Sequence, residues 1–175
     1  MAMRIVNVRE GVGARGRRHG GAVLEMAITG VLLCMICFGA IEGGWFFYCK
    51  NMMQGAAREG CRMGIVAGGT ATAVNNEILQ YLQQGGLAKS AAVSGGGPYT
   101  IAAGGTTQYT IKYYDYNFTT TTQTSVTDPS AVPVGDGFVV EIDATWGVVG
   151  GAMRPMRLLN TNKIVVAATT MRKEG

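Results

Sequence analysis

An uncharged apolar segment near the N-terminus constrains this chain more than any other feature. Met26 to Ile41 is a run of sixteen residues without a charged side chain, whereas a helix needs about 20 apolar residues to cross a bilayer. Flanking uncharged residues and the aromatic residues 45–48 extend the run. Because Trp and Tyr favour the membrane–water interface, we place one boundary near Trp45–Lys50. We therefore expect residues 21–48 to span a membrane and to contact lipid.

The charges on the two sides of this segment are unequal. The first 18 residues hold five arginines (Arg4, Arg9, Arg15, Arg17 and Arg18) against one acidic residue, Glu10. From Lys50 onward ten basic groups accompany eight acidic groups. Because basic residues favour the cytoplasmic side, we expect residues 1–20 to be a cytoplasmic leader and the C-terminal part to lie outside. A nucleic-acid partner is not indicated, since the basic excess belongs to the tail and not to a folded face.

Two other interpretations of the apolar segment remain open. A buried helix of a soluble protein would explain neither the aromatic edge nor the charge asymmetry. A secretory signal would need small residues at a cleavage point directly after the apolar run. Residues 37–39, Cys-Phe-Gly, fit that requirement poorly.

The residues before the apolar run resemble the class III leader of type IV pilin-like proteins. Arg17-Arg18-His19-Gly20 is followed by Gly21-Ala22-Val23-Leu24-Glu25. In that class a prepilin peptidase cuts after a glycine, and a glutamate is the fifth residue of the mature chain. The resemblance implies cleavage between Gly20 and Gly21, with Glu25 serving in processing and assembly. A carboxylate at the head of a lipid-embedded helix is costly and usually functional.

Two further stretches resemble the TadE-like family of minor pilins and pseudopilins. Residues 51–62 read NMMQGAAREGCR, similar to a family segment just outside the membrane, and residues 167–174 read AATTMRKE, similar to its closing strand. Residues 139–144 alternate between apolar and polar side chains in a way that is similar to the family's penultimate strand. The resemblance covers roughly 17–84 and 137–174. Met26 after Glu25 departs from the usual pattern, as does the lack of two outer cysteines that some relatives carry.

The resemblance implies a non-enzymatic structural subunit in the biogenesis of a tight-adherence (type IVc-like) pilus or a related secretion system. Its implied partners are a prepilin peptidase, the major pilin, other minor pilins and the assembly platform of the bacterial inner membrane. The implied location is that membrane, with the C-terminal domain in the periplasm or incorporated in a pilus. The alternative function is a membrane-anchored periplasmic binding or adhesion module that has no role in pilus assembly.

Periodicity and turn residues predict an α+β fold made of a long N-terminal transmembrane helix, one short helix and a small antiparallel sheet. The long helix is expected over 21–66, with residues 49–68 as its extramembrane continuation and breaks favoured near Gly43-Gly44 or Gly68-Gly69. Apolar residues at helical spacing predict a second helix over 71–82, ended by Gly85-Gly86. The outer domain is expected to occupy 69–175. Strands are predicted over 99–101, 108–118, 138–145 and 164–171, and loops over 94–98, 119–130 and 147–162.

Small residues recur at spacing four along the long helix, at Gly39, Gly43, Ala56, Gly60 and Gly64. Such spacing allows close helix packing in membranes, although the glycines could equally loosen the helix. Glu42 lies about 26 Å from Glu25 at the standard helical rise. We expect water at the outer interface to solvate it.

No catalytic, cofactor or metal site is predicted. Gly11, Gly13 and Gly16 form a G-x-G-x-x-G without a preceding strand, and Cys34-Met-Ile-Cys37 lies in lipid, where its thiols lack an activating polar setting. Cys49 and Cys61 are too far apart along one helix to form a disulfide. The single histidine, His19, lies in the predicted leader. The acidic residues of the outer part are expected to be solvated surface groups; they include Asp115, Asp128, Asp136, Glu141 and Asp143.

Overall fold

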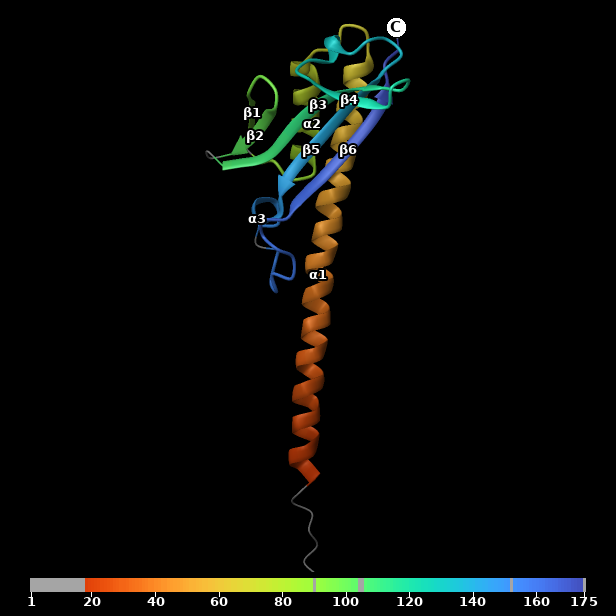
Figure 1. Cartoon of the computed structure of the whole chain (residues 1–175). Helices are drawn as coiled ribbons and strands as arrows, with labels where there is room; N and C mark the ends of the chain where they lie inside the picture. The colour runs from red at the N-terminus through yellow and green to blue at the C-terminus, as the bar shows by residue number, and fades with distance from the viewer. Residues whose placement is uncertain (1–17, 90, 104–105, 152, 175) are drawn as a thin grey trace, which may run out of the picture. The chain divides into compact units, whose positions relative to one another are not determined.

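The computed structural model describes residues 18–89, 91–103, 106–151 and 153–174. It consists of two compact units, which meet in sequence between Cys37 and Phe38. Most of the predicted leader lies outside the described residues. The elements, labelled in Figure 1, are α1 (Arg18–Ile65), α2 (Ala71–Gln84), β1 (Ala92–Ser94), β2 (Tyr99–Ala103), β3 (Thr106–Asn117), β4 (Thr122–Val126), a 3-10 turn (Pro129–Ala131), β5 (Gly137–Thr145), α3 (Trp146–Val149) and β6 (Ile164–Arg172). This confirms the predicted α+β class.

Helix α1 is continuous through both units and is exposed in the first of them. Val23, Leu24, Ile28, Val31 and Leu32 all have more than half of their surface exposed. In the second unit one face of α1 becomes buried, with Cys49, Met53, Ala56, Ala57 and Cys61 fully covered. Their spacing is that of one helical face. From Cys49 onward α1 therefore contributes one face to the hydrophobic core of the domain.

Helix α2 begins and ends at residues that suit those positions. The Thr70 hydroxyl accepts a hydrogen bond from the Ala73 N–H at 3.3 Å, a side-chain N-cap. Val74, Ile78 and Leu82 form the buried stripe that the sequence predicts. Gly85 is the C-cap and Gly86 has a φ of +70°, so the chain leaves the helix in a conformation that glycine adopts readily.

The sheet is antiparallel in every pairing, with the order β1-β2-β3-β5-β6. Strand β3 is its long central element. β5 pairs along one edge of β3, whereas β2 and β4 share the other edge, β2 pairing with residues 106–111 and β4 with residues 113–117. This arrangement makes β3 the strand to which most of the sheet is attached (Figure 1).

Alternate residues of β3 and β5 face the helices and form the core. Tyr109, Ile111 and Tyr113 of β3 are buried, as are the inward residues of β5 and β6 (Phe138, Val140, Ile142, Ala144, Val165 and Ala167). The Tyr113 hydroxyl donates a 2.6 Å hydrogen bond to Asn75 Oδ1 of α2. The buried amide and the buried phenol therefore satisfy each other, as interior polar groups must.

The fold differs from the sequence predictions in its short elements and in the bounds of α1. The predicted loop 147–162 overlaps helix α3, which was not predicted. The predicted loop 119–130 contains β4, because Asn117 Oδ1 accepts the N–H groups of Thr119 and Thr120 and turns the chain back onto β3. The short strand β1 was not predicted. Helix α1 begins at Arg18, before the expected Gly21. Of the two favoured break points, it is continuous through Gly43-Gly44 and ends at Ile65, shortly before Gly68-Gly69.

Candidate functional site

The N-terminal segment of α1 carries the predicted cleavage and assembly residues. Gly20, Gly21 and Glu25 are all helical and all exposed. A Cβ built on Gly20 or on Gly21 has no atom within 4 Å, counting the described residues only. The structure thus leaves both the predicted scissile bond and the Glu25 carboxylate uncovered by the residues it describes. Their roles in processing and assembly remain predictions.

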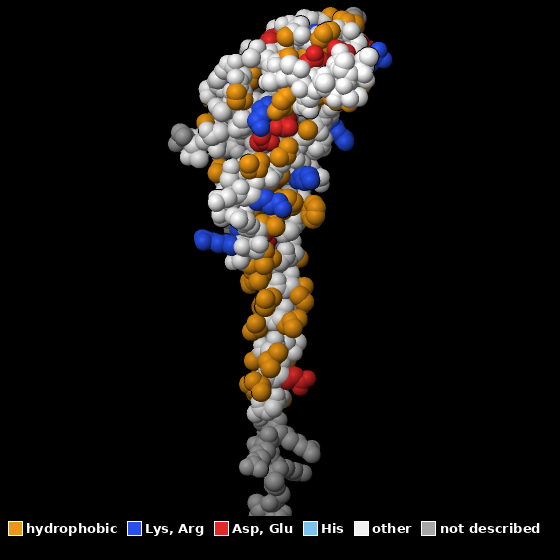
Figure 2. Space-filling view, in the orientation of Figure 1, with side chains coloured by type: hydrophobic (Ala, Val, Ile, Leu, Met, Phe, Trp, Pro, Cys, Tyr) orange, Lys and Arg blue, Asp and Glu red, His pale blue; other side chains and the backbone are white. Residues whose placement is uncertain are grey.

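The next stretch of α1 is apolar on all sides. Three consecutive residues, Val31, Leu32 and Leu33, are each 57–63% exposed, so no face of the helix is turned toward a protein core. Figure 2 shows hydrophobic side chains along this part of the helix. Among the described residues, one helix, Gly20–Ile65, is long and apolar enough to cross a membrane. A helix that is apolar all round needs an apolar environment, and this suggests membrane anchoring.

The small residues of α1 fall into two groups. A Cβ on Gly60 would lie 2.7 Å from the Ile78 side chain of α2, and one on Gly64 would lie 2.2 Å from Phe138 Cε1 of β5. These two glycines and the fully buried Ala56 therefore let the chain's own domain approach α1. Gly43 has nothing within 4 Å in the described structure. A Cβ on Gly39 would lie 3.6 Å from Leu158 Cδ1 of the chain's own loop, so of the two membrane-side glycines only Gly43 has open surroundings in the described structure.

The expectation for Glu42 is wrong: this side chain is buried, with only 1% of its surface exposed. Its Oε1 accepts the backbone N–H of Leu159 at 3.2 Å, while Oε2 has no hydrogen-bond partner among the described residues. The segment between α3 and β6 packs over it. The local sequence gives no sign of this burial, because the segment that covers Glu42 is distant in sequence. Near Glu42 the sequence shows only the aromatic residues 45–48.

The cysteines are distributed between two environments. Cys34 and Cys37 are exposed on the apolar part of α1, whereas Cys49 and Cys61 are buried in the domain, and all four are free. The Cys61 thiol donates to the Thr169 carbonyl at 3.0 Å and so contributes to packing α1 on β6.

The five acidic residues expected to be solvated are all half-buried, which corrects that prediction. Four of them have polar partners, Asp136 accepting from Asn117, whereas the buried Asp115 Oδ1 has no hydrogen-bond partner among the described residues. Lys112 Nζ lies 3.1 Å from Glu141 and also pairs with Asp143 across β3 and β5. Asp128 accepts the N–H groups of Ser130 and Ala71. Hydrogen bonding by the Ser130 side chain, followed by the Ala71 N–H, lowers the pKa of its carboxyl. Within the described ranges no three His, Cys, Asp or Glu side chains are grouped so as to hold a metal ion.

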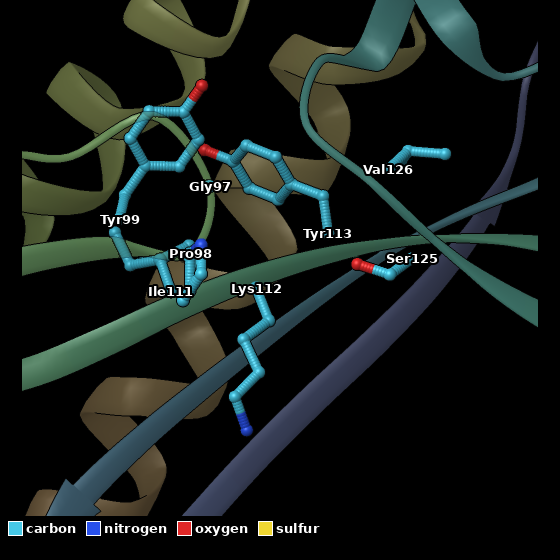
Figure 3. Close-up of a pocket in the computed structure, with 8 residues that line it drawn as sticks. All are labelled: Gly97, Pro98, Tyr99, Ile111, Lys112, Tyr113, Ser125 and Val126. Carbon is cyan, nitrogen blue, oxygen red and sulfur yellow. The ribbon is translucent and has the colours of Figure 1, made fainter.

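A small pocket lies between β2, β3 and β4, with a volume of about 90 Å³. Figure 3 shows the rings of Tyr99 and Tyr113 side by side at one end, with Lys112 extending away from them. Their ring centroids are 5.5 Å apart. The lining residues (Gly97, Pro98, Tyr99, Ile111, Lys112, Tyr113, Ser125 and Val126) include no paired nucleophile and base.

The apolar part of α1 and its continuation match a known protein family. Residues 20–62 match the family described as TadE-like protein. The matched segment includes the predicted cleavage position, Glu25, the whole apolar run and the AAREG sequence. This confirms the predicted family resemblance over that segment. Neither the curated proteins nor the solved structures contained a match.

Proposed function

We propose that this chain is a non-enzymatic pilin-like subunit in the biogenesis of a tight-adherence (type IVc-like) pilus or a related secretion system. The observation that carries the proposal is a TadE-like segment, residues 20–62, whose first half is an uncovered apolar helix. Such a helix can lie in lipid before assembly and against neighbouring helices after it. The major pilin, other minor pilins and the inner-membrane assembly platform are the proposed partners.

In this proposal the chain has four functional parts. Residues 1–20 are the leader, 21–48 the transmembrane part, 49–68 the extramembrane continuation of α1, and 69–175 the outer domain. Residues 38–48 have a second role, because Phe46 of this stretch packs edge-on against Trp146, with ring centroids 5.2 Å apart. The domain's contacts thus reach into the outer end of the proposed span.

The proposed topology has the domain in the periplasm of a bacterial inner membrane. We expect protease added to spheroplasts to digest residues 69–175 and to spare the apolar part of α1, because basic residues hold the N-terminus in the cytoplasm. An antibody or tag at the C-terminus would report this digestion. Lysed spheroplasts provide the control for protease activity. Full protection of the domain in intact spheroplasts would show the opposite topology.

The proposed processing step removes the leader between Gly20 and Gly21. We expect mass spectrometry of the membrane-extracted protein to find a chain that starts at Gly21 when prepilin peptidase is present, and the uncut chain when it is absent. Gly20→Ala should block cleavage while leaving the helix intact, since a Cβ there meets nothing within 4 Å. Gly30→Ala is a matched control with equally open surroundings.

The alternative function is a membrane-anchored periplasmic binding or adhesion module without a role in assembly. It shares the topology but needs no leader removal. An intact N-terminus in the presence of the peptidase, or a terminus near Ala40 left by a secretory peptidase, would favour this alternative.

A further inference from the structure

The segment that joins α3 to β6 differs in chemistry from the domain's other loops. Residues 150–163 contain three basic side chains, Arg154, Arg157 and Lys163, and no acidic one. Two large apolar side chains of this segment point to the outside: Met153 is 51% exposed and Leu158 is 60% exposed. Exposed apolar side chains interspersed with basic ones are typical of segments that lie in a membrane interface.

The described part of this segment, which is termed here the basic loop (residues 150–163), is fixed against α1. Leu159 donates its N–H to the buried Glu42 carboxylate at 3.2 Å, and Leu158 Cδ1 would lie 3.6 Å from a Cβ on Gly39. Arg154 donates to the Gly147 carbonyl at 3.1 Å and so closes the base of the loop. Figure 1 shows the connection from α3 to β6 beside α1.

The contact with Gly39 sets the depth of the basic loop. Gly39 belongs to the uncharged run that ends at Ile41, and Phe38 and Ile41 beside it remain 45% and 50% exposed. All of these residues belong to the same compact unit as the loop. If this end of the run lies in the outer part of the bilayer, the side chain of Leu158 lies at the same level.

We propose that the basic loop is a second membrane contact, which places Leu158 and Met153 at the boundary between headgroups and acyl chains of an anionic phospholipid surface. Arg157 and Lys163 then face lipid phosphates, as basic side chains near a membrane commonly do. The role of Glu42 is to hold the loop at this depth. The proposal rests on the proposed transmembrane placement of α1. A second copy of the same loop is a poor occupant, because the two basic segments would repel each other.

Site-directed spin labelling of the full chain in vesicles of phosphatidylethanolamine and phosphatidylglycerol tests this proposal. Labels are placed at Leu158→Cys, at Val134→Cys and at Ile28→Cys, with the exposed Cys34 and Cys37 replaced by serine. Val134 is 67% exposed and precedes β5, next to Gly135, whose N–H bonds to Lys173 beyond the far end of β6. Val134 is therefore the control position, an exposed apolar residue at the end of the domain away from Leu158. Ile28 reports whether α1 is in lipid at all.

Collisions with oxygen and with a water-soluble nickel chelate separate the outcomes. For each label the measured quantity is the ratio of its collision rate with oxygen to its collision rate with the nickel chelate. We expect this ratio to be severalfold higher for the labels at Leu158→Cys and Ile28→Cys than for the label at Val134→Cys. Adding Arg157→Glu should move the Leu158 label toward water. A nickel-accessible Leu158 beside a lipid-exposed Ile28 would overturn the loop's membrane contact alone, whereas nickel access at both would overturn the transmembrane placement. Shielding of the Leu158 label from both reagents would indicate a protein partner and would also contradict the proposal. An unchanged depth of this label in the Arg157→Glu variant would show that Arg157 does not face lipid headgroups.

Discussion

Adding one methyl group at Gly64 is expected to destabilise the domain by about 2 kcal/mol, from an overpacking cost of about 3 kcal/mol and a gain in helix propensity of about 1 kcal/mol. The new Cβ would lie 2.2 Å from Phe138 Cε1 and 2.6 Å from Cδ1. Phe138 is fully buried and also packs on Tyr113, with ring centroids 5.4 Å apart. The ring therefore has little room to move aside, and α1 must shift away from β5.

Urea unfolding of the full chain in detergent, followed by the near-ultraviolet circular dichroism of the buried Trp146, measures this effect. We expect a lower midpoint for Gly64→Ala without a change in slope. Gly43→Ala is the matched control, since its Cβ meets nothing within 4 Å in the described structure. Phe138→Leu combined with Gly64→Ala should lose less stability than the two single changes added together. A Gly64→Ala domain as stable as the wild type would mean that α1 does not pack on β5 as described.

The secondary structure was largely predictable because its signals are local. The stripe of Val74, Ile78 and Leu82 and the glycines after it defined α2, and alternating β-branched and aromatic residues defined β3, β5 and β6. Strand β4 was missed because its side chains are nearly all polar and exposed. Its pairing with β3 depends on a turn at Asn117 and not on any apolar face.

The candidate site could be predicted only where it depends on residues close in sequence. The apolar run, the basic tail and the glycine–glutamate spacing are such local patterns, and residues 20–62 match the TadE-like family. The burial of Glu42 could not be predicted, because the N–H that it binds belongs to Leu159, more than a hundred positions away. For the same reason the sequence could not separate Gly60 and Gly64, which face the domain, from Gly43, which does not.

The second large effect is expected for Glu25, the acidic residue near the start of the proposed span. An ionised carboxylate within lipid costs several kcal/mol unless it stays near the headgroups or meets a partner. In the proposed assembly that partner is the free amine of Gly21 on an adjacent subunit, which exists only after leader removal. Glutamine keeps the size of the side chain but removes its charge. Glu25→Gln is therefore expected to leave insertion, abundance and cleavage nearly unchanged and to weaken association with other pilin subunits severalfold.

Glu42 cannot serve as the control for this experiment, since its carboxylate is buried and holds Leu159. Glu59 is a better match. It lies on the same helix outside the proposed span, and its 2.8 Å contact with Arg62 is an exposed ion pair between residues one turn apart. Pairs of this kind contribute little to stability, typically about 0.2–1 kcal/mol. Glu59→Gln thus removes a charge from α1 without removing a group proposed to act in assembly.

The recovery of crosslinked pilin subunits with Glu25→Gln tests the proposed assembly role most directly. The variant and Glu59→Gln are compared with the wild type in cells that make the peptidase and the other subunits, with pilus counts as a second readout. We predict that Glu25→Gln is inserted and cleaved but recovers far fewer partner subunits, while Glu59→Gln recovers them like the wild type. Wild-type recovery and normal pilus counts for Glu25→Gln would contradict the account, because Glu25 would then be only a boundary charge.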